Sequence, residues 1–221
     1  GGVGLVELLG AGSGRAANLL FSHGNIDAGA NAVVVGPGGQ STPLALPPPT
    51  SDPSASLTRY PDLLAARAEP HVTEAADNLV RRFDELVWLV EREPVETLLF
   101  RVEPFDLLTH GLYADALGGG QDDGRGALFD VYRYADRRLG ELLGKIDADD
   151  TLVVMSDHGI RTAVEHDPAA LLFVVGPGVP VGRAAGQPEL RGVGAVIAAL
   201  SGVVADLPDT GVAPWATVRT P

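Results

Sequence analysis

The sequence predicts an α/β protein whose mainly parallel sheet carries helices on both faces. Three short apolar runs, at residues 97–102, 151–156 and 171–175, have the length and composition of buried strands. Two longer segments, 73–93 and 128–146, repeat apolar residues at the period of an amphipathic helix. Strands that alternate with helices of this length form βαβ units, which build parallel sheets covered on both sides.

The first predicted helix has a signal at each end. Thr73 is a residue type that caps the free N–H groups at a helix start, and Pro94 stops the helix because it has no N–H to donate. The second helix runs directly into the strand at 151–156, and a further helix is expected at 192–200. The apolar face of the second helix is formed by Leu128, Val131, Tyr132, Ala135, Leu139, Leu142, Leu143 and Ile146.

The first 70 residues are less regular. Residues 5–20 are compatible with a helix, and residues 32–35 with a short strand. Residues 36–53 are dense in Gly, Pro, Ser and Thr and include three consecutive prolines, which predicts a loop. We therefore divide the chain into a loop-rich segment, 1–70, and an α/β region, 71–221.

The composition argues against several classes of function. A net charge of −13 leaves no excess of Lys and Arg for a nucleic-acid-binding surface. No apolar run approaches the roughly 20 residues of a membrane helix, and no secretory leader is recognisable, so we expect no membrane segment and favour a cytoplasmic location. Because the chain has no Cys, a transition-metal site must be built from His, Asp and Glu. The composition does not indicate an oligomeric state.

Acids and histidines lie close to the predicted strands. Asp106 and His110 are four residues apart, so on a helical turn they share one face. Asp157 and His158 end the strand at 151–156, where Gly159 permits the chain to turn. Ligands of parallel α/β sheets bind at the carboxyl ends of the strands, so these side chains are expected to meet there. The set comprises Asp106, His110, Asp157, His158 and His166.

Each of these patterns is common on its own, because an acid at a strand end often only caps the next helix. Their combined order, spacing and placement favour a metal site. Glu103 and Glu165 flank the set and either orient its ligands or, in the simpler interpretation, are solvated. The glycines between 118 and 126 lack the strand-to-helix context of a phosphate-binding loop, so we interpret them as a flexible surface loop.

Three segments resemble the alkaline phosphatase superfamily, most closely its type I phosphodiesterase and nucleotide pyrophosphatase branch. Residues 136–159, which end in SDHG, resemble the strand that supplies two metal ligands. EPFDLLTH at 103–110 resembles the family's Asp-x-x-x-His element, and EHDPAALLFVVGPGV at 165–179 resembles the segment with its last ligand histidine. The resemblance is strong over 101–179 and weaker from residue 31 onward. It implies an alkaline-phosphatase-like fold, with segment 1–70 contributing to a substrate cap.

The resemblance also implies a two-metal site. Asp106, His110 and His166 would bind one divalent ion, and Asp157 and His158 would bind a second. Neutral imidazoles and carboxylates suit zinc, with manganese as the alternative. In the family a Thr or Ser hydroxyl attacks phosphorus and forms a covalent phospho-enzyme. The expected substrate is a small phosphate ester.

The chain departs from the family at its N-terminal side. The family's first strand, its metal-binding Asp and its nucleophile are not recognisable. Thr50 and Ser51 faintly resemble the nucleophile loop, and Asp27 is a weak substitute for the missing acid, but only 55 residues separate Ser51 from Asp106. We therefore expect a fold incomplete at its N-terminus, with the nucleophile upstream of Gly1, in a metal-dependent phosphodiesterase or phosphatase. The alternatives are a phosphoglycerate mutase-like phosphotransferase and a catalytically inactive metal-binding module.

Overall fold

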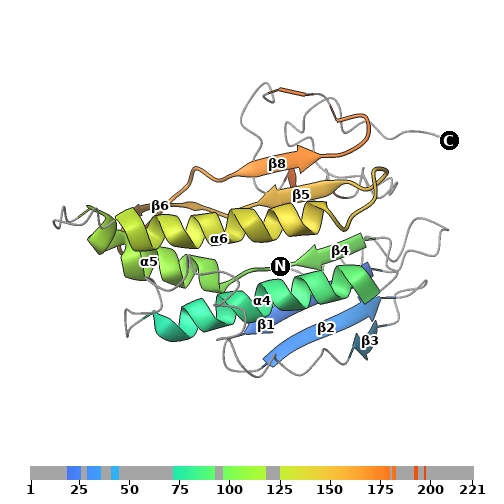
Figure 1. The fold of residues 1–221 in the computed structure, drawn as a ribbon, viewed down its shortest axis with the longest axis horizontal. Helices are drawn as coiled ribbons and strands as arrows, with labels where there is room; N and C mark the ends of the chain where they lie inside the picture. Colours follow the sequence, from blue (N-terminus) through green and yellow to red (C-terminus); the bar gives the residue numbers. More distant parts are fainter. Residues whose placement is uncertain are drawn as a thin grey trace.

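The fold was analysed in a computed structural model. The structure describes residues 19–25, 29–35, 41–44, 72–92, 97–117, 125–179, 181–182, 192–193 and 197. These residues form both helices and strands, as the sequence predicts. The helices are α4 (Thr73–Arg92), α5 (Pro104–Leu117) and α6 (Arg125–Leu143), and they cross the middle of the molecule in Figure 1.

The described strands form three separate sheets. β1 (Leu19–Asn25), β2 (Gly29–Val35), β3 (Ser41–Leu44) and β4 (Thr97–Phe100) form a four-stranded sheet in the order β3-β2-β1-β4. β5 (Leu152–Met155) pairs with β8 (Leu172–Val175), and β6 (Gly159–Thr162) pairs with β7 (Glu165–Asp167). In Figure 1, β5 and β8 lie on one side of the helices and β1 to β3 on the other.

Helix α4 has the predicted extent to within a residue or two, since it begins at Thr73 and ends at Arg92, two residues before Pro94. Thr73 is its first helical residue and not its cap, because the Val72 carbonyl accepts the first helical hydrogen bond, from the Ala76 N–H at 2.9 Å. Glu74 in its first turn and Arg92 in its last turn complement the helix dipole. The apolar spacing predicts a buried stripe of Ala76, Leu79, Val80, Phe83, Leu86, Val87 and Val90. The first five of these are buried, whereas Val87 and Val90 are only partly buried and Leu89 is buried in addition.

The core lies between the three helices. Leu108 and Leu112 of α5 and Val131 and Tyr134 of α6 are fully buried against the α4 stripe. The rings of Phe83 and Tyr134 meet edge to face, with centroids 5.6 Å apart. This packing makes α5 a rigid support for the side chains on its opposite face.

Two residues of α6 are placed differently from the prediction. Tyr132 and Leu143, expected on its buried face, are 47% and 46% exposed. The buried stripe of α6 instead runs through Val131, Tyr134, Arg138 and Leu142. Each exposed residue follows a stripe residue by one position, which rotates it about 100° around the helix and away from the core.

A buried arginine ties α4 to the chain that enters α5. The Arg82 guanidinium donates from Nη2 to the Arg101 carbonyl at 2.8 Å and lies 4.1 Å from the centre of the Phe100 ring. Burial lowers the pKa of Arg82, and the ion pair with Glu85 opposes that shift. The contact therefore fixes the end of β4, directly before the helix that carries Asp106.

The described strands do not form the mainly parallel sheet that the sequence predicts. Among them, β1 and β4 pair in parallel, whereas the other four pairings are antiparallel. β4 also belongs to a different sheet from β5 and β8. The chain between β5 and β8 forms the β6–β7 hairpin and no crossover helix, so β8 returns antiparallel to β5.

The three strands predicted as buried are only partly so. β4 is half-buried along its whole length. Phe173 and Val175 of β8 are each 58% exposed, because β5 and β8 form a sheet of two strands rather than the interior of a larger one. The strands also cover slightly fewer residues than the predicted runs 97–102, 151–156 and 171–175.

The segment 1–70 has more regular structure than predicted. β2 contains the expected strand 32–35, whereas β1 begins inside residues 5–20, which were predicted as helical. β3 lies inside the predicted loop 36–53 and contains Pro43, which a strand tolerates because β3 is at the edge of the sheet. Residues 5–18 and 45–71 lie outside the described residues, as does most of 192–200, whose described residues 192, 193 and 197 are helical. None of the helices in the described part of the chain has the length and hydrophobicity of a membrane span.

Candidate metal centre

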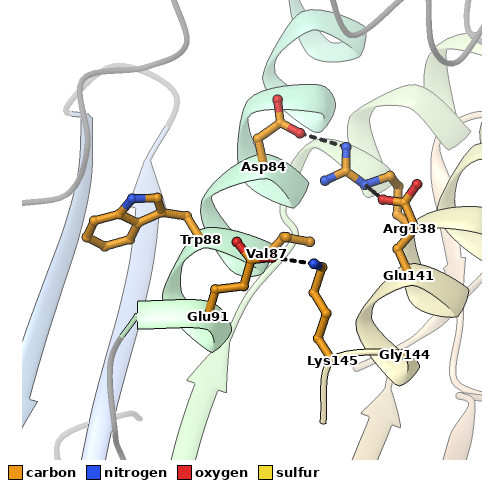
Figure 2. A pocket seen from close by; sticks show the side chains of 8 residues that line it. All are labelled: Asp84, Val87, Trp88, Glu91, Arg138, Glu141, Gly144 and Lys145. Atoms are coloured by element: carbon orange, nitrogen blue, oxygen red, sulfur yellow. Dashed lines mark hydrogen bonds and ion pairs between the residues drawn. The ribbon is translucent and has the colours of Figure 1, made fainter.

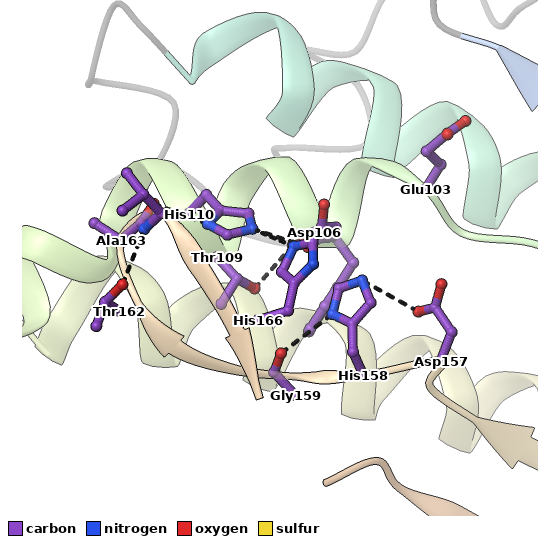
Figure 3. A network of polar contacts seen from close by, with 12 residues as sticks. Glu103, Asp106, Thr109, His110, Asp157, His158, Gly159, Thr162, Ala163 and His166 are labelled. Carbon is purple, nitrogen blue, oxygen red and sulfur yellow. Dashed lines mark hydrogen bonds and ion pairs between the residues drawn. The ribbon is translucent and has the colours of Figure 1, made fainter. Parts of the chain in front are cut away.

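The predicted ligands meet where the β6–β7 hairpin contacts α5 (Figure 3). Asp106 and His110 lie on α5, His158 directly precedes β6, and His166 is the central residue of β7. We expected the ligands at the carboxyl edge of a parallel sheet, with His166 on the approach to the strand 171–175. That location is wrong, because a separate short strand carries His166 back against the helix.

Helix α5 orders the first two ligands. It begins at Pro104, a residue suited to a first helical position, and Asp106 in its first turn complements the helix dipole. Leu108 and Leu112 face the core, so Asp106 and His110, two positions earlier in each case, lie on the opposite side of the helix. The sequence predicted a helical turn at this place, and the structure has a helix that continues to Leu117.

Three ligand atoms lie close enough to share one ion. Asp106 Oδ1 is 3.4 Å from His110 Nε2 and 3.7 Å from His166 Nε2, and the two Nε2 atoms are 2.8 Å apart. These separations are all below about 4.2 Å, twice a usual zinc bond length of about 2.1 Å, so the three atoms could hold one divalent ion together. The three residues therefore fit a divalent metal without rearrangement of the backbone.

His158 lies against the same group of atoms. Its ring stacks on His166, with centroids 3.7 Å apart and planes 15° from parallel. Single ligand atoms of Asp106, His158 and His166 all lie within 4.8 Å of one another. The Asp157 side chain is 61% exposed, and its Oδ1 lies 3.5 Å from His158 Nε2. The structure thus brings four of the five predicted residues together, with the fifth beside them.

The two possible triads share Asp106 and His166 and differ in the third ligand. Two atoms bound to one ion at about 2.1 Å cannot be more than about 4.2 Å apart. The triad with His110 meets this limit at every pair of atoms, whereas the 4.8 Å bound for the triad with His158 does not guarantee it. We therefore favour His110 as the third ligand and place His158 on the flank of the site.

Backbone carbonyls set the proton positions on two of the histidines. His110 Nδ1 lies 2.9 Å from the Ala163 carbonyl, and His158 Nδ1 lies 3.1 Å from the Gly159 carbonyl. A carbonyl only accepts, so each Nδ1 carries the proton and a neutral ring keeps a lone pair on Nε2. His110 Nε2 then accepts from His166 Nε2–H, and an ion bound there takes the place of that proton.

Position 159 requires glycine because of close packing and not because of the predicted turn. Its φ angle is not in the left-handed region, which among the described glycines is occupied by Gly178 and Gly182. A Cβ at position 159 would instead lie 2.6 Å from the Ala169 carbonyl oxygen. The position requires glycine because the chain leading into β8 passes directly over it.

Glu165 fits its simpler interpretation as a solvated residue, whereas Glu103 does not, because its Oε2 atom is buried without a hydrogen-bond partner among the described residues. Glu103 pairs with Arg101 at 3.4 Å and points away from the ligands in Figure 3, and Glu165 is exposed. Gly126 belongs to α6 and not to a surface loop, whereas residues 118–124 lie outside the described residues. Tyr113 was not singled out from the sequence. Its position three residues after His110, on the same face of α5, was the available signal.

A separate cavity lies between α4 and α6, with a volume of about 480 Å³ (Figure 2). Its charged residues pair with one another: Arg138 with Asp84 at 2.6 Å, and Lys145 with Glu91. The metal-centre residues are not among those that line it. The predicted chemistry is therefore on the surface of α5 and the hairpin, not in this cavity.

No protein-family model, curated protein or solved structure matches the chain. The resemblance to the alkaline phosphatase superfamily therefore stays a prediction.

Proposed function

We propose that this chain carries the divalent-metal centre of a phosphate-ester hydrolase, a phosphodiesterase or phosphatase. The main support is the convergence of residues that the resemblance designates as ligands. His110 and His166 are 56 residues apart in the sequence, yet their Nε2 atoms are 2.8 Å apart. We extend the proposal to the fold, as the carboxyl part of an alkaline-phosphatase-like domain.

The donor set agrees with a metal of the proposed kind. Neutral imidazoles and a carboxylate oxygen suit zinc, with manganese as the alternative. A divalent ion held there supplies a positive charge that polarises a phosphoryl oxygen and offsets negative charge in the transition state. Asp106 and His166 are partly exposed, which leaves the site open to a substrate from solution.

Among the described residues, the two threonine hydroxyls near the site are each engaged in a hydrogen bond with the backbone. The Thr109 side chain is buried and donates to the Phe105 carbonyl at 2.8 Å, and the Thr162 hydroxyl accepts from the Val164 N–H at 3.3 Å. Thr50 and Ser51 lie outside the described residues. We therefore propose that the described residues bind metal without supplying the group that attacks phosphorus.

The same observation favours a second candidate, a metal-binding module without turnover. A phosphotransferase of the phosphoglycerate mutase type shares the same kind of metal ligands and is the third. Metal binding does not distinguish these candidates, because all of them bind metal. Activity does, because only the hydrolase transfers the phosphoryl group to water when its nucleophile is present.

Metal content tests the proposed site first. After dialysis against zinc or manganese, the wild-type chain should retain about one ion, because three ligands converge at one point and only Asp157 and His158 remain for a second. His110→Ala should lose most of it. Glu165→Gln, next to His166 but exposed, is the matched control and should bind as the wild type does. Equal metal content in wild type and His110→Ala would refute the site.

Activity tests the proposed absence of the nucleophile. With saturating zinc, residues 1–221 should hydrolyse an activated aryl phosphodiester no faster than zinc in buffer. Turnover that Ser51→Ala or Thr50→Ala abolishes would show that the nucleophile is inside this chain. It would leave the metal assignment intact.

A further inference from the structure

Two side chains of α5, three residues apart, hold the β6–β7 hairpin. His110 donates from Nδ1 to the Ala163 carbonyl at 2.9 Å, and the Tyr113 hydroxyl donates to the Arg161 carbonyl at 2.6 Å. Arg161 belongs to β6, and Ala163 lies in the turn between β6 and β7. His110 is a predicted ligand, whereas no role has so far been assigned to Tyr113.

The Tyr113 contact falls on an irregularity of the hairpin. Ile160 pairs with His166 and Thr162 pairs with Glu165, so the register skips Arg161. Such a β-bulge leaves its extra residue outside the strand ladder and re-aims the neighbouring side chains. The Tyr113 hydroxyl bonds the carbonyl of this extra residue, directly beside the strand partner of His166.

The hairpin is short and partly exposed. β7 has three residues, and Val164 in the turn is 86% exposed. The Arg161–Asp167 ion pair, at 3.6 Å, is within the hairpin and largely exposed, so it contributes little. A two-stranded hairpin is marginal on its own, which makes its hydrogen bonds to α5 important for where His166 lies.

We propose that Tyr113 is a positioning residue of the metal centre. It fixes the bulge of β6 against α5 and so holds His166 within reach of Asp106 and His110. This inference rests on the proposed metal site. Its physical basis is that groups which orient metal ligands typically change metal affinity about 10- to 100-fold when they are removed.

The test compares Tyr113→Phe with Tyr132→Phe. Each variant removes one hydroxyl, and Tyr132 lies on α6 with its ring against Phe105. Zinc affinity, measured by competition with a chromophoric chelator, should fall about 10-fold in Tyr113→Phe and stay unchanged in Tyr132→Phe. The cobalt absorption band should change in the first variant only, because His166 then approaches the ion in a different geometry.

Urea unfolding in the presence of a chelator separates positioning from a general fold defect. Without metal, Tyr113→Phe should lose no more stability than one hydrogen bond contributes, about 0.5–1.5 kcal/mol, and Tyr132→Phe should unfold as the wild type does. Unchanged zinc affinity or an unchanged cobalt band in Tyr113→Phe would overturn the inference, as would a loss of stability without metal well above that of one hydrogen bond. Wild-type protein that binds no zinc would instead overturn the proposed function itself.

Discussion

Replacement of Gly159 by Ala tests how closely the chain packs behind the metal centre. A Cβ at this position would lie 2.6 Å from the Ala169 carbonyl oxygen, whereas ordinary contacts begin at 3.4 Å. The carbonyl would therefore have to retreat by about 0.8 Å, and it is backbone, which does not rotate away as a side chain does. Overpacking of this kind costs about 1–3 kcal/mol.

A second effect has the opposite sign. Ala restricts the unfolded chain more than Gly does, which stabilises by about 0.4–1 kcal/mol where the native backbone permits Ala. The φ angle of Gly159 is not in the left-handed region, so this gain applies. The clash is the larger effect, and we expect a net destabilisation of about 1–2 kcal/mol. Zinc affinity should also fall, because Gly159 pairs with Asp167, the neighbour of His166, so a shift of the backbone at position 159 also moves that predicted ligand.

Two other glycines provide the controls. Gly140 lies in α6, and a Cβ added there would meet no other part of the chain within 4 Å, so Gly140→Ala should stabilise by about 0.5–1 kcal/mol. At Gly176 a Cβ would lie 2.5 Å from Thr151 Oγ1, so Gly176→Ala should destabilise without weakening zinc binding. Urea unfolding and zinc titration of the three variants measure both effects. Gly159→Ala as stable as the wild type, or more stable, would refute the argument.

Two further predictions concern the packing and the ion pairs. Leu108→Ala should destabilise the fold by about 2–5 kcal/mol in urea unfolding, because the Leu108 side chain is fully buried. Leu107→Ala is the control and should cost far less, because Leu107 is 44% exposed. Equal losses of stability in the two variants would contradict the described core. The hydrogen bond from Lys145 lowers the pKa of Glu91 below its ordinary value of 4.5. This pair therefore stabilises the fold at pH values above 4.5, and its contribution is lost as the pH falls through the lower pKa that Glu91 has in the folded state. Glu91→Gln should therefore be less stable than the wild type at neutral pH and equal to it in strong acid, and a difference that persists in acid would contradict the assignment.

The parts of the fold that follow from the sequence are those set by local chemistry. Thr73 and Pro94 are themselves the signals that begin and end α4, and the apolar spacing of α6 predicts most of its core face. The apolar runs predict that β4, β5 and β8 exist. Their pairing depends on what connects them. Nothing in residues 157–171 has a helical period, but the absence of that period does not by itself indicate a hairpin.

Pro43 shows how a local rule fails when the sheet position is unknown. Its missing N–H argues against a central strand, and it lies in the segment 36–53, which was predicted as a loop from its composition and its three consecutive prolines. The structure places it in β3, at the edge of the four-stranded sheet, where a missing donor costs less. The order of strands that makes this edge is a property of the whole sheet, and no residue near Pro43 encodes it.

The candidate site divides in the same way. Asp106 and His110 belong to one helix, so their common face follows from their spacing alone. The choice of His110 over His158 as the partner of Asp106 and His166 depends on where the hairpin lies against α5. That position is set by contacts between residues about 50 apart, from His110 to Ala163 and from Tyr113 to Arg161. Residue types therefore indicate the candidate ligands, whereas the position of the β6–β7 hairpin on α5 decides which of them lie together.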